Sequence, residues 1–187
     1  IVDGDLIIGM CALAMAEEGS LKGKTIVTTP MSNIGLELTL RERGIAMERA
    51  QVGDRYVVEL MRKKGYNLGG EQSGHLIFLD QSTTGDGIVA ALKVLEYMKR
   101  KQKPLSELRK SIRLLPQVRE DVRVSRREPL EKMPDITSAI ELAKKELADR
   151  GRVFVRYSGT EPLLRVMVEG ENLAKIQALA KNIAQSI

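Results

Sequence analysis

Helix and strand patterns alternate along the first part of the chain, and this alternation restricts the folds that it can adopt. An apolar stretch between Asp5 and Glu18 predicts a helix, and the β-branched residues from Lys24 to Thr29 predict a buried strand. Further strands are predicted at 45–50 and 76–79, and further helices at 33–43, 56–64 and from 88 onward. Elements in this order predict an α/β domain, with helices on both faces of a mixed, mainly parallel sheet.

Two polar residues mark the predicted helix starts, and one helix has a continuous apolar face. Asp5 is the expected N-cap of the first helix and Ser32 that of the second, because short polar side chains accept hydrogen bonds from the free N–H groups of a first helical turn. The helix that begins near residue 88 carries four large apolar side chains on one face, namely Ile88, Leu92, Leu95 and Met98.

The composition changes after this helix, and we expect the domain boundary there. Pro104 breaks the long helix, and a short basic connector runs from it to Pro116. Residues 1–103 are predicted to form the α/β domain, and residues 104–187 a hinge followed by a small α+β domain. In the second domain, strands near 122–124, 152–155 and 163–168 and two amphipathic helices predict an antiparallel sheet covered by helices.

Composition is that of a globular protein and carries no signature of nucleic-acid or membrane binding. Hydrophobic residues make up 43% of the chain, and the net charge of +5 is spread among interleaved acids and bases. Aromatic residues make up only 3%, so a stacking platform for nucleic acid is lacking. The apolar stretch from Leu6 to Ala16 is too short for membrane insertion. A single cysteine, Cys11, excludes an internal disulfide and favours a cytoplasmic location.

The loop from Arg156 to Pro162 lies between two predicted strands and has the chemistry of an oxyanion site. Arg156 offers a planar fork of charged donors, and Arg165 follows the loop closely enough to reach the same anion. Ser158 and Thr160 add hydroxyl donors, whereas Gly159 permits close backbone approach and a positive φ. The alternative is an ordinary polar turn with Arg156 in a surface ion pair.

A second dense stretch, from Gly69 to His75, suits the recognition of sugar hydroxyls. Glu71 can accept hydrogen bonds from two adjacent hydroxyls, and Ser73 can add a third contact. His75 is the only histidine, and the alternative for it is a hydrogen-bonded structural role at a strand entry. No second histidine or cysteine lies near enough in sequence to complete a zinc site.

Together, Gly70-Glu71-Gln72-Ser73-Gly74-His75 and Arg156-Tyr157-Ser158-Gly159-Thr160-Glu161-Pro162 resemble the phosphohexomutase superfamily, and most closely its bacterial phosphoglucosamine mutase family. The first motif matches the sugar-binding loop of that family's third domain and the second the phosphate-binding loop of its fourth. Val52-Gly53-Asp54-Arg55-Tyr56 and Thr84-Gly85-Asp86-Gly87 match further landmarks. Gln72 fits the glucosamine branch.

The resemblance implies a role for each matched residue. Glu71 and Ser73 would hold sugar hydroxyls, and His75 would contact the sugar or assist proton transfer. Arg55 would face the cleft. The phosphate that is not transferred would be bound by the second motif and by the nearby Arg165. The residues concerned are Arg156, Ser158, Gly159, Thr160 and Arg165.

The resemblance also implies a longer enzyme, of which this chain is the C-terminal part. The family's phosphorylated serine and its Asp-Gly-Asp-x-Asp-Arg magnesium loop are absent, and the chain begins at Ile1. The parent enzyme would convert glucosamine 6-phosphate to glucosamine 1-phosphate through a 1,6-bisphosphate, with Mg²⁺ held outside this chain. The chain itself would contain no catalytic residue, bind no cofactor and be inactive alone.

The expected partners are a hexosamine phosphate and the N-terminal domains of the same protein. Two alternatives stay open. The chain would be the same half of a phosphoglucomutase or phosphomannomutase, or it would serve as an interaction module for a regulatory partner such as a diadenylate cyclase.

Overall fold

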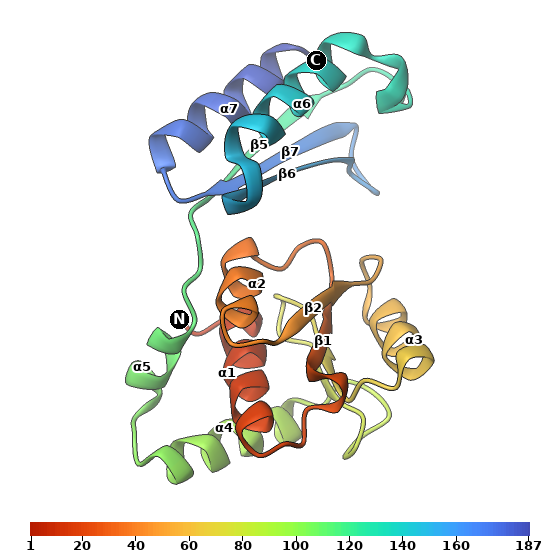
Figure 1. Ribbon diagram of the computed structural model, residues 1–187. Helices are drawn as coiled ribbons and strands as arrows, with labels where there is room; N and C mark the ends of the chain where they lie inside the picture. Colours follow the sequence, from red (N-terminus) through yellow and green to blue (C-terminus); the bar gives the residue numbers. More distant parts are fainter. The chain divides into compact units, whose positions relative to one another are not determined.

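A computed structural model describes all residues, 1–187, and divides into two compact units at residues 1–114 and 115–187 (Figure 1). Each unit has its own sheet and its own apolar core. The predicted fold class is confirmed, because the first sheet is mostly parallel and the second is entirely antiparallel.

The first unit is built around a four-stranded sheet in the order β2-β1-β3-β4. Its strands are β1 (Thr25–Thr28), β2 (Ala46–Arg49), β3 (Leu68–Gly70) and β4 (Leu76–Phe78). Its helices are α1 (Gly4–Glu17), α2 (Ile34–Arg41), α3 (Asp54–Lys64), α4 (Gly87–Lys101) and α5 (Leu105–Leu108), with 3-10 turns η1 (Lys22–Lys24) and η2 (Arg109–Ser111). β1 pairs in parallel with β2 and β3, whereas β3 and β4 are antiparallel. β3 was not predicted, since it is three residues long and two of them are glycine.

Alternate strand residues divide the core of the first unit between the two faces of the sheet. Ile26 and Phe78 join α1, α2 and α4 in the larger cluster. Val27 points to the other face, where Val57 and Met61 of α3 cover it. Figure 1 shows α1 and α3 on opposite sides of the strands. Helices therefore cover both faces, as predicted.

The connector belongs to the first unit. Leu108 and Ile112 are buried in the larger cluster of that unit, so the division falls after residue 114 instead of before Pro104. The apolar side chains of the connector explain the difference, because they gain more from burial on α1 and α2 than from remaining in a solvated hinge.

The second unit is a three-stranded antiparallel sheet with two helices on one face (Figure 1). Its strands are β5 (Gln117–Arg123), β6 (Gly151–Tyr157) and β7 (Leu163–Gly170), in the order β5-β7-β6. Its helices are α6 (Pro134–Leu147) and α7 (Leu173–Gln185), with 3-10 turns η3 (Leu130–Lys132) and η4 (Ala148–Arg150). Val153, Val166 and Val168 face the helices and form a core with Ile176 and Leu179.

The helix caps differ from the predicted ones by one or two residues. Asp3 caps α1 by accepting the N–H of Leu6 at 3.0 Å, and Asn33 caps α2 by accepting the N–H of Gly35 at 2.8 Å. Asp5 lies inside the first turn, fully buried, and accepts the backbone N–H of Asn33 at 2.8 Å. The carboxylate of Asp5 thus joins the starts of two helices, a long-range contact that no local pattern reveals.

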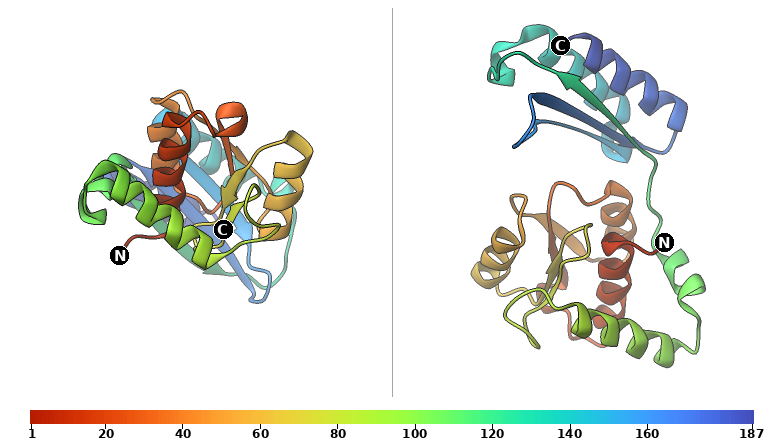
Figure 2. Two further views of the ribbon diagram at one scale, coloured as in Figure 1. Left: turned by 90° about the horizontal axis from the view of Figure 1, so that it is seen from below. Right: turned by 180° about the vertical axis from the view of Figure 1, so that it is seen from behind.

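The predicted apolar face of α4 is not the face that packs on the sheet. Ile88, Leu92 and Leu95 are 76%, 59% and 57% exposed, whereas Ala90 and Tyr97 are buried. Of the four predicted residues, only Met98 packs against the core, and it is partly buried. α4 lies beside α1 (Figure 2), and its buried side chains join the apolar cluster that α1 also contributes to.

Cys11 lies on the side of α1 that faces α4, and burial raises the pKa of its thiol to about 12. It is therefore an unreactive core thiol. None of the helices combines the length and the apolar character that crossing a membrane requires.

The burial of Met61 on α3 and the exposure of Leu92 on α4 predict unequal effects for two similar substitutions. Met61→Ala should lower the free energy of unfolding of the first unit by about 2–5 kcal/mol, because it empties a fully buried site. Leu92→Ala should change it by less than about 0.5 kcal/mol, because the side chain is largely exposed. Urea unfolding followed by circular dichroism measures both, and equal losses would show that the Leu92 face of α4 is packed.

Candidate functional site

The loop at residues 158–162, here the β6–β7 loop, closes an antiparallel hairpin. The Ser158 N–H donates to the carbonyl of Leu163 at 2.8 Å, and strand pairing begins with Tyr157 opposite Leu164. The loop therefore lies between two strands, as predicted, and the pairing shows that these strands form a hairpin. The register then places Arg156 directly opposite Arg165.

Arg156 and Arg165 project from the face of the sheet that α6 and α7 leave open. Their neighbours in the sequence, Val155 and Val166, face the helices instead, and side chains alternate along a strand. The loop therefore has two guanidinium groups beside it on one open face.

On β6 and β7 these two arginines face each other instead of an acid, and the acid opposite Arg165 on β5, Asp121, binds Arg119 at 3.2 Å. On the same face, Arg152 lies opposite Glu169, and the two form an ion pair at 2.7 Å with the carboxylate fully buried. Arg165 instead faces Arg156, and its Nη2 reaches Glu161 at 2.5 Å while its Nε is buried without a hydrogen-bond partner in the chain. Like charges directly opposite on a sheet are unfavourable unless an anion lies between them.

The loop tip presents its backbone to solvent. Ser158 is 1% exposed, and its Oγ accepts the N–H of Glu161 at 3.3 Å, so its side chain shapes the turn from inside. Gly159 and Thr160 are exposed. Gly159 does not use the positive φ that glycine permits, and a Cβ placed on it would meet no atom within 4 Å. The space over its backbone is open.

The other candidate stretch, Gly69 to His75, contains the turn at residues 71–75. This turn connects β3 to β4 and is here called the β3–β4 turn. The Glu71 N–H donates to the carbonyl of His75 at 2.9 Å, and the Gly74 N–H donates to the carbonyl of Glu71 at 3.0 Å. Gly74 has φ of 104°, a backbone region that favours glycine. The turn is thus a tight hairpin that orients the Glu71 side chain.

The Glu71 carboxylate is partly buried, and a backbone N–H group donates a hydrogen bond to it. Its Oε1 accepts the N–H of Gly53 at 3.2 Å, and its Oε2 lies 3.7 Å from Nδ1 of His75. Gly53 precedes α3 with φ of 125°, so glycine is needed where the chain brings this N–H to the carboxylate. Oε1 of Glu71 is thus anchored by the backbone, whereas Oε2 has only the imidazole of His75 beside it.

A cavity of about 460 Å³ lies over the β3–β4 turn. It is lined by Asp3, Thr29, Met31, Val52, Glu71, Gln72 and Ser73. The lining comes from the chain segments that follow β1, β2 and β3 and from the cap of α1. Ligands of open α/β sheets bind beyond the carboxyl ends of the strands, so this is the expected place for a small polar molecule.

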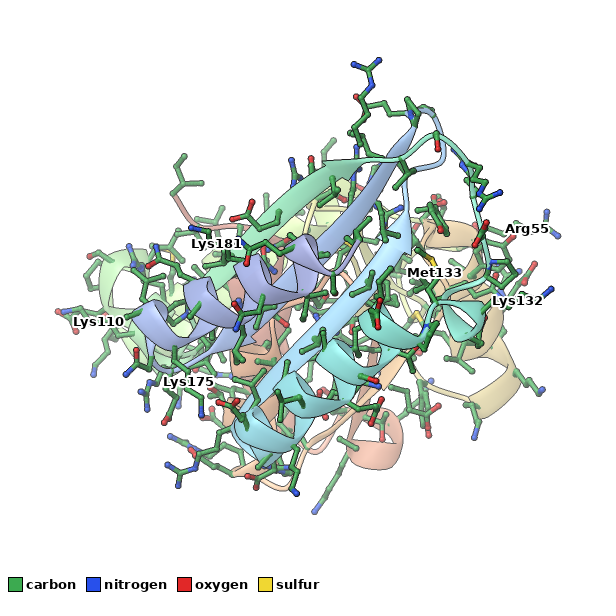
Figure 3. All side chains as sticks on the ribbon, turned by 90° about the horizontal axis from the view of Figure 1, so that it is seen from above. Arg55, Lys110, Lys132, Met133, Lys175 and Lys181 are labelled. Carbon is green, nitrogen blue, oxygen red and sulfur yellow. The ribbon has the colours of Figure 1, made fainter.

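The structure brings Glu71 and Ser73 to the cavity but leaves two other predicted residues outside its lining. His75 is exposed and does not line the cavity, although its ring lies beside Glu71, which does. The side chain of Arg55, labelled in Figure 3, is 80% exposed and binds Glu59 at 2.8 Å, which raises the pKa of its guanidinium. Thr29 and Val52 were not predicted, although the parallel order of the strands would have pointed to the segments after β1 and β2.

Metal binding has no candidate residues in either unit. No three His, Cys, Asp or Glu side chains lie close enough together to hold a metal ion.

Two family models match the chain, one for each unit. Residues 3–114 match "Phosphoglucomutase/phosphomannomutase, alpha/beta/alpha domain III", and residues 121–186 match "Phosphoglucomutase/phosphomannomutase, C-terminal domain". The phosphoglucosamine mutase of Syntrophotalea carbinolica is 53% identical over 100% of this chain and 41% of its own length. That of Sorangium cellulosum is 54% identical over 100% of the chain and 39% of its own. The chain spans about two fifths of these curated relatives.

Solved structures share the fold at low sequence identity. An N-acetylglucosamine-phosphate mutase in a product complex superposes with a TM-score of 0.79 at 18% identity, over 100% of this chain and 44% of that one. N-acetylphosphoglucosamine mutase from Aspergillus fumigatus, in complex with GlcNAc-6P and magnesium, gives 0.79 at 20% identity, over 99% and 46%. Both structures cover nearly all of this chain, so the shared fold includes both units.

The tight contact between α1 and the β3–β4 turn predicts that Gly4 is irreplaceable. A Cβ on Gly4 would lie 2.2 Å from the carbonyl oxygen of Glu71, and its N–H donates to the carbonyl of Gln72 at 3.1 Å. Gly4→Ala should therefore lower the free energy of unfolding of the first unit by about 2 kcal/mol or more. Gly87→Ala is the control, because a Cβ there meets no atom within 4 Å. Equal stability of the two variants in urea would contradict the contact.

Proposed function

Since the chain belongs to the phosphoglucomutase/phosphomannomutase family, we propose that it forms the substrate-binding part of a phosphoglucosamine mutase. Such an enzyme is an isomerase that interconverts glucosamine 6-phosphate and glucosamine 1-phosphate through a 1,6-bisphosphate. In this proposal the first unit recognises the sugar and the second unit binds the phosphate that is not being transferred.

One observation carries the proposal, namely the unbalanced pair of arginines beside the β6–β7 loop. Arg156 and Arg165 lie opposite each other in register, and Glu161 is the one acid that binds either of them. A phosphate group between the two guanidinium groups would relieve their repulsion and accept charge-assisted hydrogen bonds. The exposed backbone at Gly159 and Thr160 adds room and donors for its remaining oxygens.

The cavity over the β3–β4 turn supports the sugar part of the proposal. The anchored carboxylate of Glu71 presents one free oxygen as an acceptor, and Ser73 adds a hydroxyl at the same rim. A rigid acceptor is suited to neighbouring hydroxyl groups, because its geometry does not have to be organised when the sugar binds. Gln72 offers a further polar contact in the same lining.

In the proposed reaction this chain supplies position and charge. Phosphoryl transfer depends chiefly on alignment of the reacting groups and on neutralisation of charge. A phosphate held at the β6–β7 loop is remote from the reacting end, and its binding energy lowers the barrier only by fixing the sugar there. The phosphoserine and the magnesium site that the family resemblance implies would belong to other parts of the enzyme, and no residue cluster in this chain fits a metal.

Sugar preference separates the proposal from its rival, the same half of a phosphoglucomutase or phosphomannomutase. The most similar relatives named above favour glucosamine, because they are phosphoglucosamine mutases at 53% and 54% identity. A diadenylate cyclase partner and a cytoplasmic location remain predictions.

Calorimetric titration of the 187-residue chain with glucosamine 1-phosphate tests the phosphate site. Saturable binding is expected, with glucose 1-phosphate and mannose 1-phosphate weaker. Arg156→Ala should lower the affinity at least about tenfold, which corresponds to about 1.4 kcal/mol and to the loss of one charge-assisted contact. Arg150→Ala is the matched control, since Arg150 is exposed and pairs only with Glu171 at the far end of β6. Unchanged binding by Arg156→Ala would reject the phosphate assignment, and tighter binding of glucose 1-phosphate or mannose 1-phosphate would favour the rival.

Glu71→Gln tests the sugar site with the same titration. The substitution keeps the shape of the side chain but removes the charge of the acceptor, so affinity for glucosamine 1-phosphate should fall about tenfold while affinity for inorganic phosphate stays the same. Glu96→Gln, on the exposed side of α4, is the control and should leave both affinities unchanged. A parallel loss for sugar phosphate and inorganic phosphate would contradict a role in sugar recognition.

A further inference from the structure

Arg127 holds three carbonyl groups of the β6–β7 loop, although its sequence position marks it only as part of a short basic pair. Its Nη2 donates to the carbonyl oxygen of Ser158 at 2.6 Å and lies 3.3 Å from that of Glu161 and 3.4 Å from that of Gly159. Three converging carbonyl oxygens create a negative potential. The guanidinium cancels this potential beside the site where a phosphate is expected.

The segment that carries Arg127 is pinned to the hairpin on both sides of the arginine. The Val124 N–H donates to the carbonyl of Pro162 at 2.9 Å. On the other side, the Tyr157 hydroxyl donates to the carbonyl of Glu128 at 2.7 Å and accepts the N–H of Glu128 at 3.2 Å. The position of Arg127 relative to the loop is therefore set by backbone contacts.

The hydrogen bonds to Arg127 also determine where the loop N–H groups point. The peptide bonds are all trans, so the N–H of each peptide points away from its own carbonyl. The carbonyls of Ser158 and Gly159 face Arg127, and the N–H groups of the same two peptides belong to Gly159 and Thr160. No hydrogen bond within the chain uses either N–H. Successive free N–H groups of this kind form an anion-binding concavity.

We propose that Arg127 is a positioning residue for phosphate. It holds the carbonyls of the β6–β7 loop on one side, so that the N–H groups of Gly159 and Thr160 are presented on the other, and it does not touch the anion itself. This inference rests on the proposed function of the loop, but the orientation of the loop can be measured without a ligand.

Arg127→Gln and Arg126→Gln form a matched pair for the test. Arg126 is the adjacent residue, its side chain is 80% exposed, and it binds only the carboxylate of Glu128. Both variants remove one positive charge near the loop, but only Arg127→Gln removes the bonds to the loop carbonyls. The 187-residue chain, labelled with ¹⁵N, is titrated with inorganic phosphate while the backbone amides of Gly159 and Thr160 are followed by NMR.

Arg127→Gln is expected to weaken phosphate binding about tenfold with an unchanged thermal midpoint, whereas Arg126→Gln weakens it by about twofold at most. Arg127→Lys should stay within about threefold of the unchanged chain, because an ammonium also offers three donors to converging carbonyls. Equal losses in Arg127→Gln and Arg126→Gln would overturn the proposal in favour of charge alone. If Arg127→Lys bound phosphate as weakly as Arg127→Gln, the role of the donated hydrogen bonds would be overturned.

A second measurement separates this inference from the proposed function. The backbone order parameters of Gly159 and Thr160, recorded without phosphate, should fall below about 0.6 in Arg127→Gln and stay near those of the unchanged chain in Arg126→Gln. If the unchanged chain does not bind phosphate, the proposed function of the loop fails, and a fall in order parameters still supports the holding role of Arg127. Unchanged order parameters in Arg127→Gln would overturn that role whether or not phosphate binds.

Discussion

The parallel pairing of β1 with both β2 and β3 is the constraint on which the first unit depends. Three parallel strands end at one edge of the sheet, so the segments that follow them meet there. Thr29, Val52 and Glu71 come from different parts of the chain and line one cavity for this reason. The N-terminus of α1 closes the same edge, and it approaches so closely that Gly4 has no space for a side chain.

In the second unit, the register between β6 and β7 decides which side chains come together. A single alignment of β6 with β7 places Arg152 opposite Glu169 and Arg156 opposite Arg165. The first pair is neutral and buried, and it stabilises the end of the sheet away from the loop. The second pair concentrates positive charge at the loop, because Asp121, the partner of Arg165 on β5, binds Arg119. One sheet face therefore contains both a structural ion pair and a site that favours an anion.

Local sequence patterns identified most elements, and the differences arise where tertiary contacts decide. Asp5 has the chemistry of a helix cap, but its burial against the start of α2 leaves capping to Asp3. The stripe of Ile88, Leu92 and Leu95 has the spacing of a core face, yet α4 packs through Ala90 and Tyr97. Periodicity shows that a helix has two faces. It cannot show which face another helix will cover.

The sequence by itself determined the alternation of helices and strands, the strands on either side of the β6–β7 loop and the polar residues of both loops, because these follow from local preferences and short motifs. Only the tertiary structure decided which residues share the cavity, that Arg156 opposes Arg165, and that Arg127 holds the loop carbonyls. The physical reason is that strand order, strand register and the packing of one helix on another join residues far apart in the chain. Contacts of that kind depend on the whole fold, and no short stretch of sequence specifies them.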